Sequence, residues 1–180
     1  MHIHLKQVSS KRERKIIRDL YKRAFPAPER APYWMLTLKA HRRGIDWWSI
    51  YDGDTWAGFF YVLTYNDLAY VFYFAIAEQF RGKGYGSHAL TELKEKYPDK
   101  RIFLAIEQLD PAAENYDERV NRKQFYAHNG FSDLNQKLRE ASMVYSLLGI
   151  GGTIQKEEYQ ALIRNWGGAL LPRLVKMGIE

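Results

Sequence analysis

The chain has 180 residues, of which 46% are hydrophobic and 27% are charged. These proportions are typical of a soluble globular protein and exclude a disordered or fibrous one, and the length suits one domain with its own core. The chain contains no cysteine, which excludes a disulfide scaffold, a cysteine nucleophile and a thiolate metal centre and favours a cytoplasmic protein. The longest apolar run, residues 70–77, is too short to span a bilayer, so we expect no membrane partner.

Positive charge is concentrated at the start of the chain. The formal net charge is +6, yet residues 1–44 alone hold twelve Lys and Arg against three Asp and Glu. A basic segment of this kind can attract phosphate-bearing partners, including nucleic acid. It is also typical of a helix face in water. Because no aromatic and basic nucleic-acid module follows, we favour the solvated face and do not expect a nucleic-acid partner.

Alternation and helical periodicity predict the elements of the first half. Residues 3–8 alternate as a half-buried strand, and a capping box of Ser10 and Glu13 begins a helix that ends before Pro26. A second, short helix is predicted over residues 32–44, because Gly44 is a typical helix end. Aromatic and β-branched residues then predict an antiparallel meander with tight turns. Its three strands are predicted over residues 47–51, 56–64 and 68–77.

The second half alternates helices with strands. A polar, glycine-rich loop over residues 78–86 follows the meander, and two helices, three strands and a terminal helix come after it. Two αβ crossovers in a largely antiparallel sheet predict an α/β (α+β) fold with a mixed sheet and helices on both faces. The first two helices are predicted over residues 87–97 and 117–128, and the three strands over residues 101–107, 131–138 and 142–148.

The strongest functional signal is the loop between the meander and the next helix. The run Arg81-Gly82-Lys83-Gly84-Tyr85-Gly86 lets the backbone turn sharply and approach a ligand. The helix that follows points free N–H groups at this loop, and Arg81 and Lys83 add positive charge, which favours a pyrophosphate over a plain glycine-rich turn. The glycine spacing differs from that of dinucleotide-binding loops, and the Gly-Lys-Ser/Thr of a Walker loop is absent.

Two motifs have the spacing of one known family. The first is Arg81-x-x-Gly84-x-Gly86, with a further glycine at position 82, and the second is Phe125-Tyr126-x-x-x-Gly130-Phe131. With both motifs the chain resembles the GNAT superfamily of acyl-CoA-dependent N-acyltransferases. The motifs and their elements cover residues 68–148, and the element order fits over residues 1–148. The resemblance implies a mostly antiparallel sheet with splayed central strands.

The resemblance implies acetyl-CoA or coenzyme A as co-substrate and no metal. In the family, loop amides bind the pyrophosphate of coenzyme A, and the strand before the loop binds the pantetheine amides. The cofactor-binding residues that this implies are Phe74, Ala75 and Ile76 on the strand, and Arg81, Gly82, Lys83, Gly84, Tyr85, Gly86 and Ser87 at the loop. Where many members carry an asparagine that touches the cofactor, this sequence has Arg119.

The resemblance also implies direct attack of an amine on the thioester, with no covalent enzyme intermediate. Tyr126 occupies the position of the acid that protonates the leaving thiolate, and the alternative is a tyrosine that packs the helix on the sheet. Glu107 is the candidate for the base or for a group that orients the amine. Glu78, or a backbone carbonyl with a chain of water molecules, is the alternative base. In the family, the segment that carries Tyr33 and Trp34 lines the acceptor site, so both residues are candidate substrate contacts.

The expected function is therefore transfer of an acetyl group from acetyl-CoA to a primary amine of a small molecule or peptide. The alternative is a non-catalytic module of the same fold that contacts nucleic acid through its basic first helix. We assign residues 1–148 to the acetyltransferase-like domain and residues 149–180 to a C-terminal helical extension packed on it. The extension is expected to cover the sheet, line the acceptor site or form a homodimer contact. No motif identifies the acceptor amine.

Overall fold

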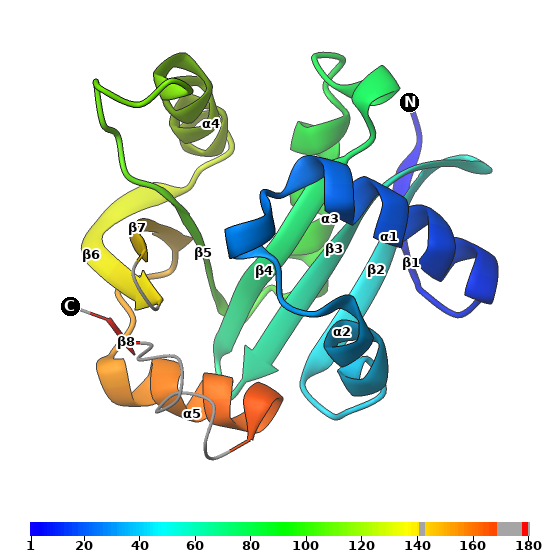
Figure 1. Ribbon diagram of the computed structural model, residues 1–180. Helices are drawn as coiled ribbons and strands as arrows, with labels where there is room; N and C mark the ends of the chain where they lie inside the picture. Colours follow the sequence, from blue (N-terminus) through cyan, green and yellow to red (C-terminus); the bar gives the residue numbers. More distant parts are fainter. Residues whose placement is uncertain (141–142, 169–177, 180) are drawn as a thin grey trace. The chain divides into compact units, whose positions relative to one another are not determined.

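An eight-stranded, mostly antiparallel sheet organises the fold, with the strand order β1-β2-β3-β4-β5-β7-β6-β8 (Figure 1). The computed structural model describes residues 1–140, 143–168 and 178–179. It contains two units, of which unit 1 comprises Met1–Leu63 and Phe72–Pro98 and unit 2 comprises Thr64–Val71 and Asp99–Glu180. The predicted mixed sheet with helices is confirmed, because β4 and β5 pair in parallel, whereas the pairs β1–β2, β2–β3, β5–β7, β6–β7 and β6–β8 are antiparallel.

Unit 1 holds the predicted first strand and most of the predicted meander. β1 (Ile3–Gln7) pairs with β2 (Ile45–Asp52), and β2 pairs with β3 (Thr55–Tyr65), both antiparallel. The next strand in the sheet is β4 (Leu68–Ile76), whose last residues belong to unit 1. Glycine at position 58 lets β3 approach β4, because a Cβ there would lie 2.3 Å from the Ala75 carbonyl oxygen.

We expect Gly58→Ala to destabilise unit 1 severely. The new methyl group would meet the Ala75 carbonyl oxygen at 2.3 Å and the Ile76 Cα at 3.1 Å, and both are backbone atoms that can move only if the strands separate. The free energy of unfolding should fall by about 3 kcal/mol or more, as measured by urea denaturation. Gly178→Ala is the matched control, because a Cβ at Gly178 meets nothing within 4 Å. Equal urea midpoints for the two variants would contradict the described approach of the strands.

α1 (Lys11–Ala24) begins at the predicted capping box. The Ser10 hydroxyl accepts a hydrogen bond from the Glu13 N–H at 3.1 Å, and the Glu13 carboxylate accepts one from the Ser10 N–H at 3.0 Å. Burial raises the pKa of Glu13, but hydrogen bonds from Ser10 and Ser9 outweigh it and lower the pKa from 4.5 to about 2. The charged carboxylate therefore stabilises the helix start above its unfolded pKa of 4.5, and this stabilisation is lost as the pH falls toward 2.

α2 (Tyr33–Lys39) is shorter than the helix predicted over residues 32–44. It ends at Lys39 with Ala40 as its C-cap. Two successive turns follow, in which the Arg42 N–H donates to the Lys39 carbonyl and the Ile45 N–H donates to the Arg42 carbonyl. Gly44, with a φ of +84°, ends these turns instead of the helix. The predicted helix boundary was wrong because a glycine suits the end of a helix and the end of a turn equally well. In Figure 1, α1 and α2 lie in front of the strands of unit 1.

Unit 2 continues the sheet from the first residues of β4. Leu68–Tyr70 pair in parallel with Arg101–Phe103 of β5 (Arg101–Glu107). β5 pairs antiparallel with β7, β7 with β6, and β6 with β8. α4 connects β5 to β6, and α5 follows β7. These elements are α4 (Tyr116–His128), β6 (Ser132–Glu140), β7 (Met143–Ile150), α5 (Lys156–Gly167) and β8 (Gly178–Ile179).

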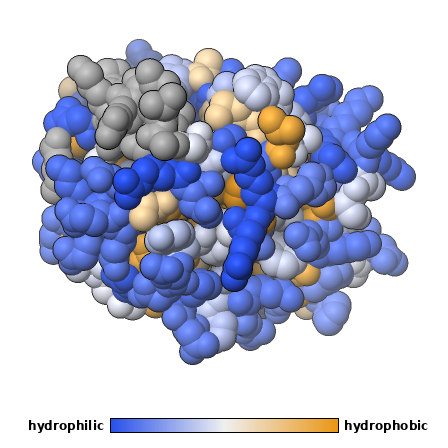
Figure 2. Space-filling model, turned by 90° about the horizontal axis from the view of Figure 1, so that it is seen from below, coloured by the Kyte–Doolittle hydropathy of each residue, from blue (hydrophilic) through white to orange (hydrophobic). Residues whose placement is uncertain are grey.

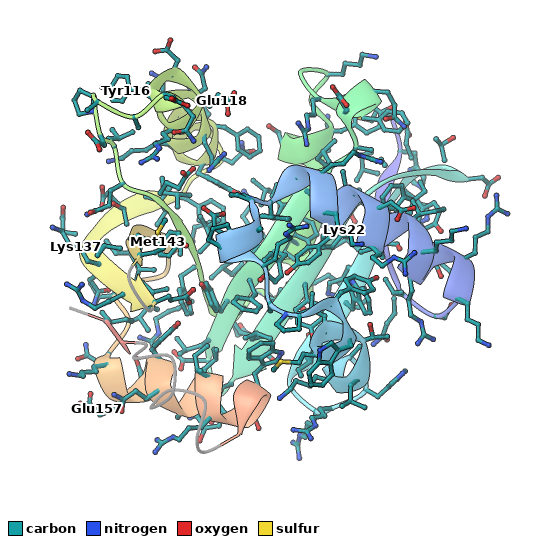
Figure 3. All side chains as sticks on the ribbon, in the orientation of Figure 1. Lys22, Tyr116, Glu118, Lys137, Met143 and Glu157 are labelled. Atoms are coloured by element: carbon teal, nitrogen blue, oxygen red, sulfur yellow. The ribbon has the colours of Figure 1, made fainter. Side chains whose placement is uncertain are left out.

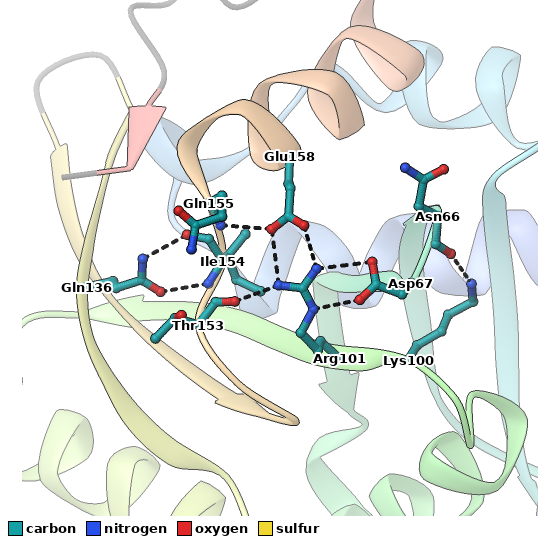
Figure 4. A network of polar contacts seen from close by, with 9 residues as sticks. All are labelled: Asn66, Asp67, Lys100, Arg101, Gln136, Thr153, Ile154, Gln155 and Glu158. Carbon is teal, nitrogen blue, oxygen red and sulfur yellow. Dashed lines mark hydrogen bonds and ion pairs between the residues drawn. The ribbon is translucent and has the colours of Figure 1, made fainter.

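Arg101 fixes the start of α5 to the sheet of unit 2 (Figure 4). Its guanidinium donates hydrogen bonds of 2.7 and 3.0 Å to the Asp67 carboxylate and of 2.6 and 3.1 Å to the Glu158 carboxylate. It also donates to the Thr153 carbonyl at 2.7 Å. These contacts join the turn before β4, the start of β5 and α5 through one side chain.

The predicted terminal helix is present as α5 and buries one apolar side. Tyr159, Leu162, Ile163 and Trp166 are the buried residues of this helix. The two-residue strand β8 was not predicted, and the intervening residues 169–177 of the predicted extension lie outside the described part of the chain. On the face shown in Figure 2, hydrophilic side chains cover most of the surface and apolar ones show in separate small areas. Of the helices that the structure describes, none has the length and apolar composition needed to cross a bilayer.

Candidate functional site

The predicted anion-binding loop lies in unit 1 between β4 and α3 (Tyr85–Lys96). Gly82 and Gly84 have φ values of +70° and +83°, a left-handed conformation that other residues rarely adopt. Gly84 is the N-cap of α3 and provides no side-chain cap, so the first N–H groups of the helix lack this partner. A Cβ at Gly82 would meet nothing within 4 Å. The loop is therefore exposed, has open space next to Gly82, and leads directly into the N-terminus of α3.

The two basic side chains of the loop hold its backbone in shape. Arg81 Nε donates to the Ile76 carbonyl at 3.0 Å, and Lys83 Nζ donates to the Gln79 carbonyl at 2.8 Å. These bonds fix the turn after β4 and keep two positive charges close to the loop. Arg81 and Lys83 thus combine a structural contact with the charge that the sequence suggested for an anion site.

The end of β4 supports this loop from within unit 1. Ala75 and Ile76 are buried, and the Phe74 ring stacks on Phe60 with 4.2 Å between the ring centroids. The Ala77 N–H donates to the Ala57 carbonyl at 2.8 Å, which ties the strand end to β3. The strand residues predicted to meet a pantetheine chain are therefore held in a fixed backbone conformation.

Tyr85 braces the first turn of α3. Its hydroxyl donates to the Asp52 carboxylate at 2.8 Å, and the same carboxylate accepts from the His2 N–H at 2.7 Å. The Tyr85 ring also lies 4.8 Å from the Phe80 ring. The hydrogen bond to Asp52 raises the pKa of Tyr85. Sequence reasoning missed Asp52, because nothing in a turn residue at the end of β2 indicates a partner in α3.

Glu107 lies at the end of β5 in unit 2, among side chains from α4 and its N-cap. Arg122 Nη1 is 2.7 Å from one carboxylate oxygen, and Arg119 Nη2 is 3.1 Å from the other. Asn115 Nδ2 donates to Glu107 Oε1 at 3.3 Å. Both oxygens of the candidate base are thus already bonded to other side chains, and the Glu107 side chain is 14% exposed.

Arg119, which stands where many family members carry an asparagine, connects α4 to the loop after β5. Its Nε donates to the Asn115 side chain at 2.8 Å, its Nη1 donates to the Gln108 carbonyl at 2.8 Å, and its Nη2 pairs with Glu107. All three guanidinium nitrogens are used within unit 2. Within the described part of the chain, no group of three His, Asp or Glu side chains could hold a metal ion.

A pocket of about 420 Å³ opens beside Glu107 in unit 2. Two large apolar residues of its lining are exposed to solvent: Leu109 is 42% exposed and Met143 is 37% exposed. In Figure 3, Met143 is labelled close to β7, and Tyr116 and Glu118 are labelled on α4. Sequence reasoning found Glu107 here but missed the apolar residues, which follow no recognisable motif. The lining residues are Glu107, Gln108, Leu109, Asp110, Pro111, Arg119, Met143 and Val144.

Tyr126 lies in the last turn of α4 and is 8% exposed. Its ring packs against Phe125 and Phe131, with centroid distances of 5.2 and 5.6 Å. Burial raises the pKa of Tyr126 to about 12, and the positive charge of Arg122 acts in the opposite direction. Tyr126 therefore keeps its proton at neutral pH and also has the packing contacts that the alternative interpretation requires.

The two predicted acceptor contacts differ in their surroundings on α2. The Tyr33 hydroxyl donates to the Arg14 carbonyl of α1, and its ring meets that of Trp47 at 5.9 Å between centroids. Burial raises the pKa of Tyr33. Trp34, by contrast, has 65% of its surface exposed. Tyr33 therefore joins α2 to α1, whereas Trp34 is accessible to a ligand.

Comparison with known proteins decides the family. Residues 14–131 match the model of the Acetyltransferase (GNAT) family. The chain belongs to the GNAT acetyltransferase family. The matched range contains both the glycine loop and Tyr126, so the resemblance stated from these two motifs is confirmed. No curated protein matches the sequence of the chain.

Solved structures share the GNAT fold at low sequence identity. A GNAT-family protein from Bacteroides thetaiotaomicron is 22% identical with a TM-score of 0.70, and the match covers 93% of this chain and 98% of that one. The Bacillus subtilis acetyltransferase in complex with CoA is 15% identical, with 83% and 97% covered and a TM-score of 0.57. The ribosomal-protein-S18-alanine N-acetyltransferase from Escherichia coli is 12% identical, with 86% and 97% covered and a TM-score of 0.59. At these identities the likeness establishes the fold alone.

Proposed function

We propose that this GNAT protein transfers an acetyl group from acetyl-CoA to a primary amine of a small molecule or peptide. The observation that carries the proposal is the exposed glycine loop at the uncapped N-terminus of α3, in a chain of an acetyltransferase family. Helix N-termini bind phosphate through free N–H groups and the helix dipole. Residues 81–87 are proposed to bind the pyrophosphate of coenzyme A, and residues 74–76 the pantetheine chain. A similar structure from Bacillus subtilis holds CoA, which supports the same co-substrate here.

The proposed chemistry is direct attack. The amine nitrogen forms a bond to the thioester carbonyl carbon and gives up its surplus proton to water, while the carbon–sulfur bond breaks and Tyr126 gives its proton to the departing thiolate. The tyrosinate then takes a proton back from solvent. Glu107, in the pocket beside Leu109 and Met143, is proposed to orient the acceptor amine. To take up the amine proton it would have to release Arg119 or Arg122, so its contacts favour orientation over the role of base. Trp34 is proposed as a further acceptor contact because it is exposed.

A thiol-release assay with a panel of amines and peptides tests this function. The chain has no cysteine, so every thiol detected comes from coenzyme A, and mass spectrometry identifies the acetylated product. We expect thiol release that depends on the amine. Binding of acetyl-CoA without transfer to any amine of the panel would contradict the enzymatic proposal and favour a binding module.

A second candidate function is contact with nucleic acid through α1, and one observation favours it. Lys11, Lys15, Arg18 and Lys22 follow the i, i+4, i+7, i+11 spacing of a single helix face, and all four are exposed. Figure 3 labels Lys22 on this helix. Filter binding of DNA and RNA at two salt concentrations tests this function. Tight and steeply salt-dependent binding would support it, and weak binding at the lower salt concentration would exclude it.

We expect Tyr85→Phe to weaken binding of coenzyme A by about three- to tenfold, the effect of losing one hydrogen bond. The ring keeps its contact with Phe80, but the first turn of α3 loses its link to Asp52. Isothermal titration with coenzyme A measures the change. Tyr51→Phe is the control, because the Tyr51 hydroxyl donates to Glu13 of α1 and should not affect the loop. Equal affinities of Tyr85→Phe and the parent would remove Tyr85 as a support of the site.

A further inference from the structure

Two guanidiniums and one carboxylate form a cluster at the end of β5. Glu107 pairs with Arg119 at 3.1 Å and with Arg122 at 2.7 Å, and the side chains are 14%, 19% and 41% exposed respectively. The cluster thus carries one net positive charge. Arg119 is held at all three of its nitrogens, which anchors Glu107, and Glu107 in turn anchors Arg122. Arg119 pairs with one oxygen of the Glu107 carboxylate, and Arg122 pairs with the other. The carboxylate that holds the Arg122 charge is therefore itself held in place.

The helix register places this charge next to Tyr126. Arg122 stands four residues before Tyr126 on α4, and side chains at this separation are neighbours on the helix surface. The Tyr126 ring is itself held by Phe125 and Phe131. Lys123, the next cation on α4, pairs with Asp133 of β6 at 2.8 Å, so that pair adds no net charge. Burial raises the pKa of Tyr126, and the positive charge of Arg122 lowers it.

A buried phenol that gives up its proton must carry a negative charge in a poorly solvated place, which makes it a weak acid. We propose that Arg122, held by Glu107, is a positioning residue whose fixed positive charge stabilises the ionised form of Tyr126 and so makes Tyr126 an effective proton donor. This inference rests on the proposed function, because it assigns a supporting group to the proposed acid. It also gives the two ion pairs of Glu107 a second role, beside the proposed orientation of the acceptor amine.

The test measures ionisation of residue 126 directly. A fluorinated tyrosine placed at position 126 ionises at lower pH than tyrosine, so its titration can be followed by fluorine NMR while the protein is folded. Arg122→Met should raise the pKa of the fluorinated phenol by about one unit, and Arg122→Lys should restore most of the parent value. Lys123→Met, which removes a cation paired with Asp133, is the matched control and should leave the pKa nearly unchanged. Equal pKa values in the parent and in Arg122→Met would overturn the inference.

A transfer assay on the unmodified chain separates this inference from the proposed function. Arg122→Met should lower kcat by up to about tenfold with little change in KM for acetyl-CoA, and Arg122→Lys should keep most of the activity. The titration needs no acetyl-CoA, so it can succeed even if the parent transfers to no amine, in which case the proposed function alone fails. Transfer by the parent together with an unshifted titration would overturn only the role of Arg122. Melting curves of all variants show whether each is folded.

Discussion

Tyr126→Phe is expected to lower turnover by about 10²–10⁴-fold, the usual contribution of a general acid. The variant loses the hydroxyl proton but keeps the ring, and the contacts of that ring with Phe125 and Phe131 do not involve the hydroxyl. Binding of coenzyme A and thermal stability should therefore change little. Steady-state transfer to any accepted amine, a cofactor titration and a melting curve are measured on the same variant.

The control for this variant is Tyr116→Phe, which removes a hydroxyl from the first turn of the same helix. It should keep nearly the full activity of the parent. If Tyr126→Phe loses stability and activity in proportion, its role is packing. If Tyr126→Phe keeps full activity, Tyr126 has no part in proton transfer, and the positioning role of Arg122 loses its purpose although the titration can still detect its charge.

Gly84→Asp should reduce the affinity for coenzyme A by about 100-fold or more. The new carboxylate would stand at the N-cap of α3. There it would accept hydrogen bonds from the N–H groups that are proposed to bind the pyrophosphate, and it would repel the negative charge of the pyrophosphate. Aspartate tolerates the left-handed conformation that Gly84 adopts at a φ of +83° better than most residues, so the variant should fold. Isothermal titration with coenzyme A measures the loss.

Gly53→Asp is the matched control for this prediction. Gly53 also has a left-handed backbone, with a φ of +55°, and lies in the turn between β2 and β3 of the same unit. The two variants carry the same added charge and comparable backbone strain, so they should differ in cofactor affinity alone. Unchanged affinity in Gly84→Asp would move the cofactor site away from the loop, and equal losses in both variants would indicate a general effect on unit 1.

The amino-acid sequence by itself determined the features that depend on neighbouring residues. Three such features are the capping box of Ser10 and Glu13, the alternation of β1 and the apolar side of α5. Each depends on residues that lie close together in the sequence, within one helix or strand. The glycine loop belongs to the same class, because a strand, a glycine-rich turn and a helix follow one another directly. The family follows from this loop and from the motif around Tyr126, both of which are local.

Only the tertiary structure decided which charged side chains act together. The sequence identified Glu107 as a carboxylate at a strand end, but its partners Arg119 and Arg122 come from a helix whose rotation about its axis no local pattern fixes. The links from Tyr85 to Asp52 and from Arg101 to Glu158 span 33 and 57 positions of the chain. Such pairs form because sheet packing brings distant segments together and burial favours a partner for each charge, and neither condition can be read from the residues beside them.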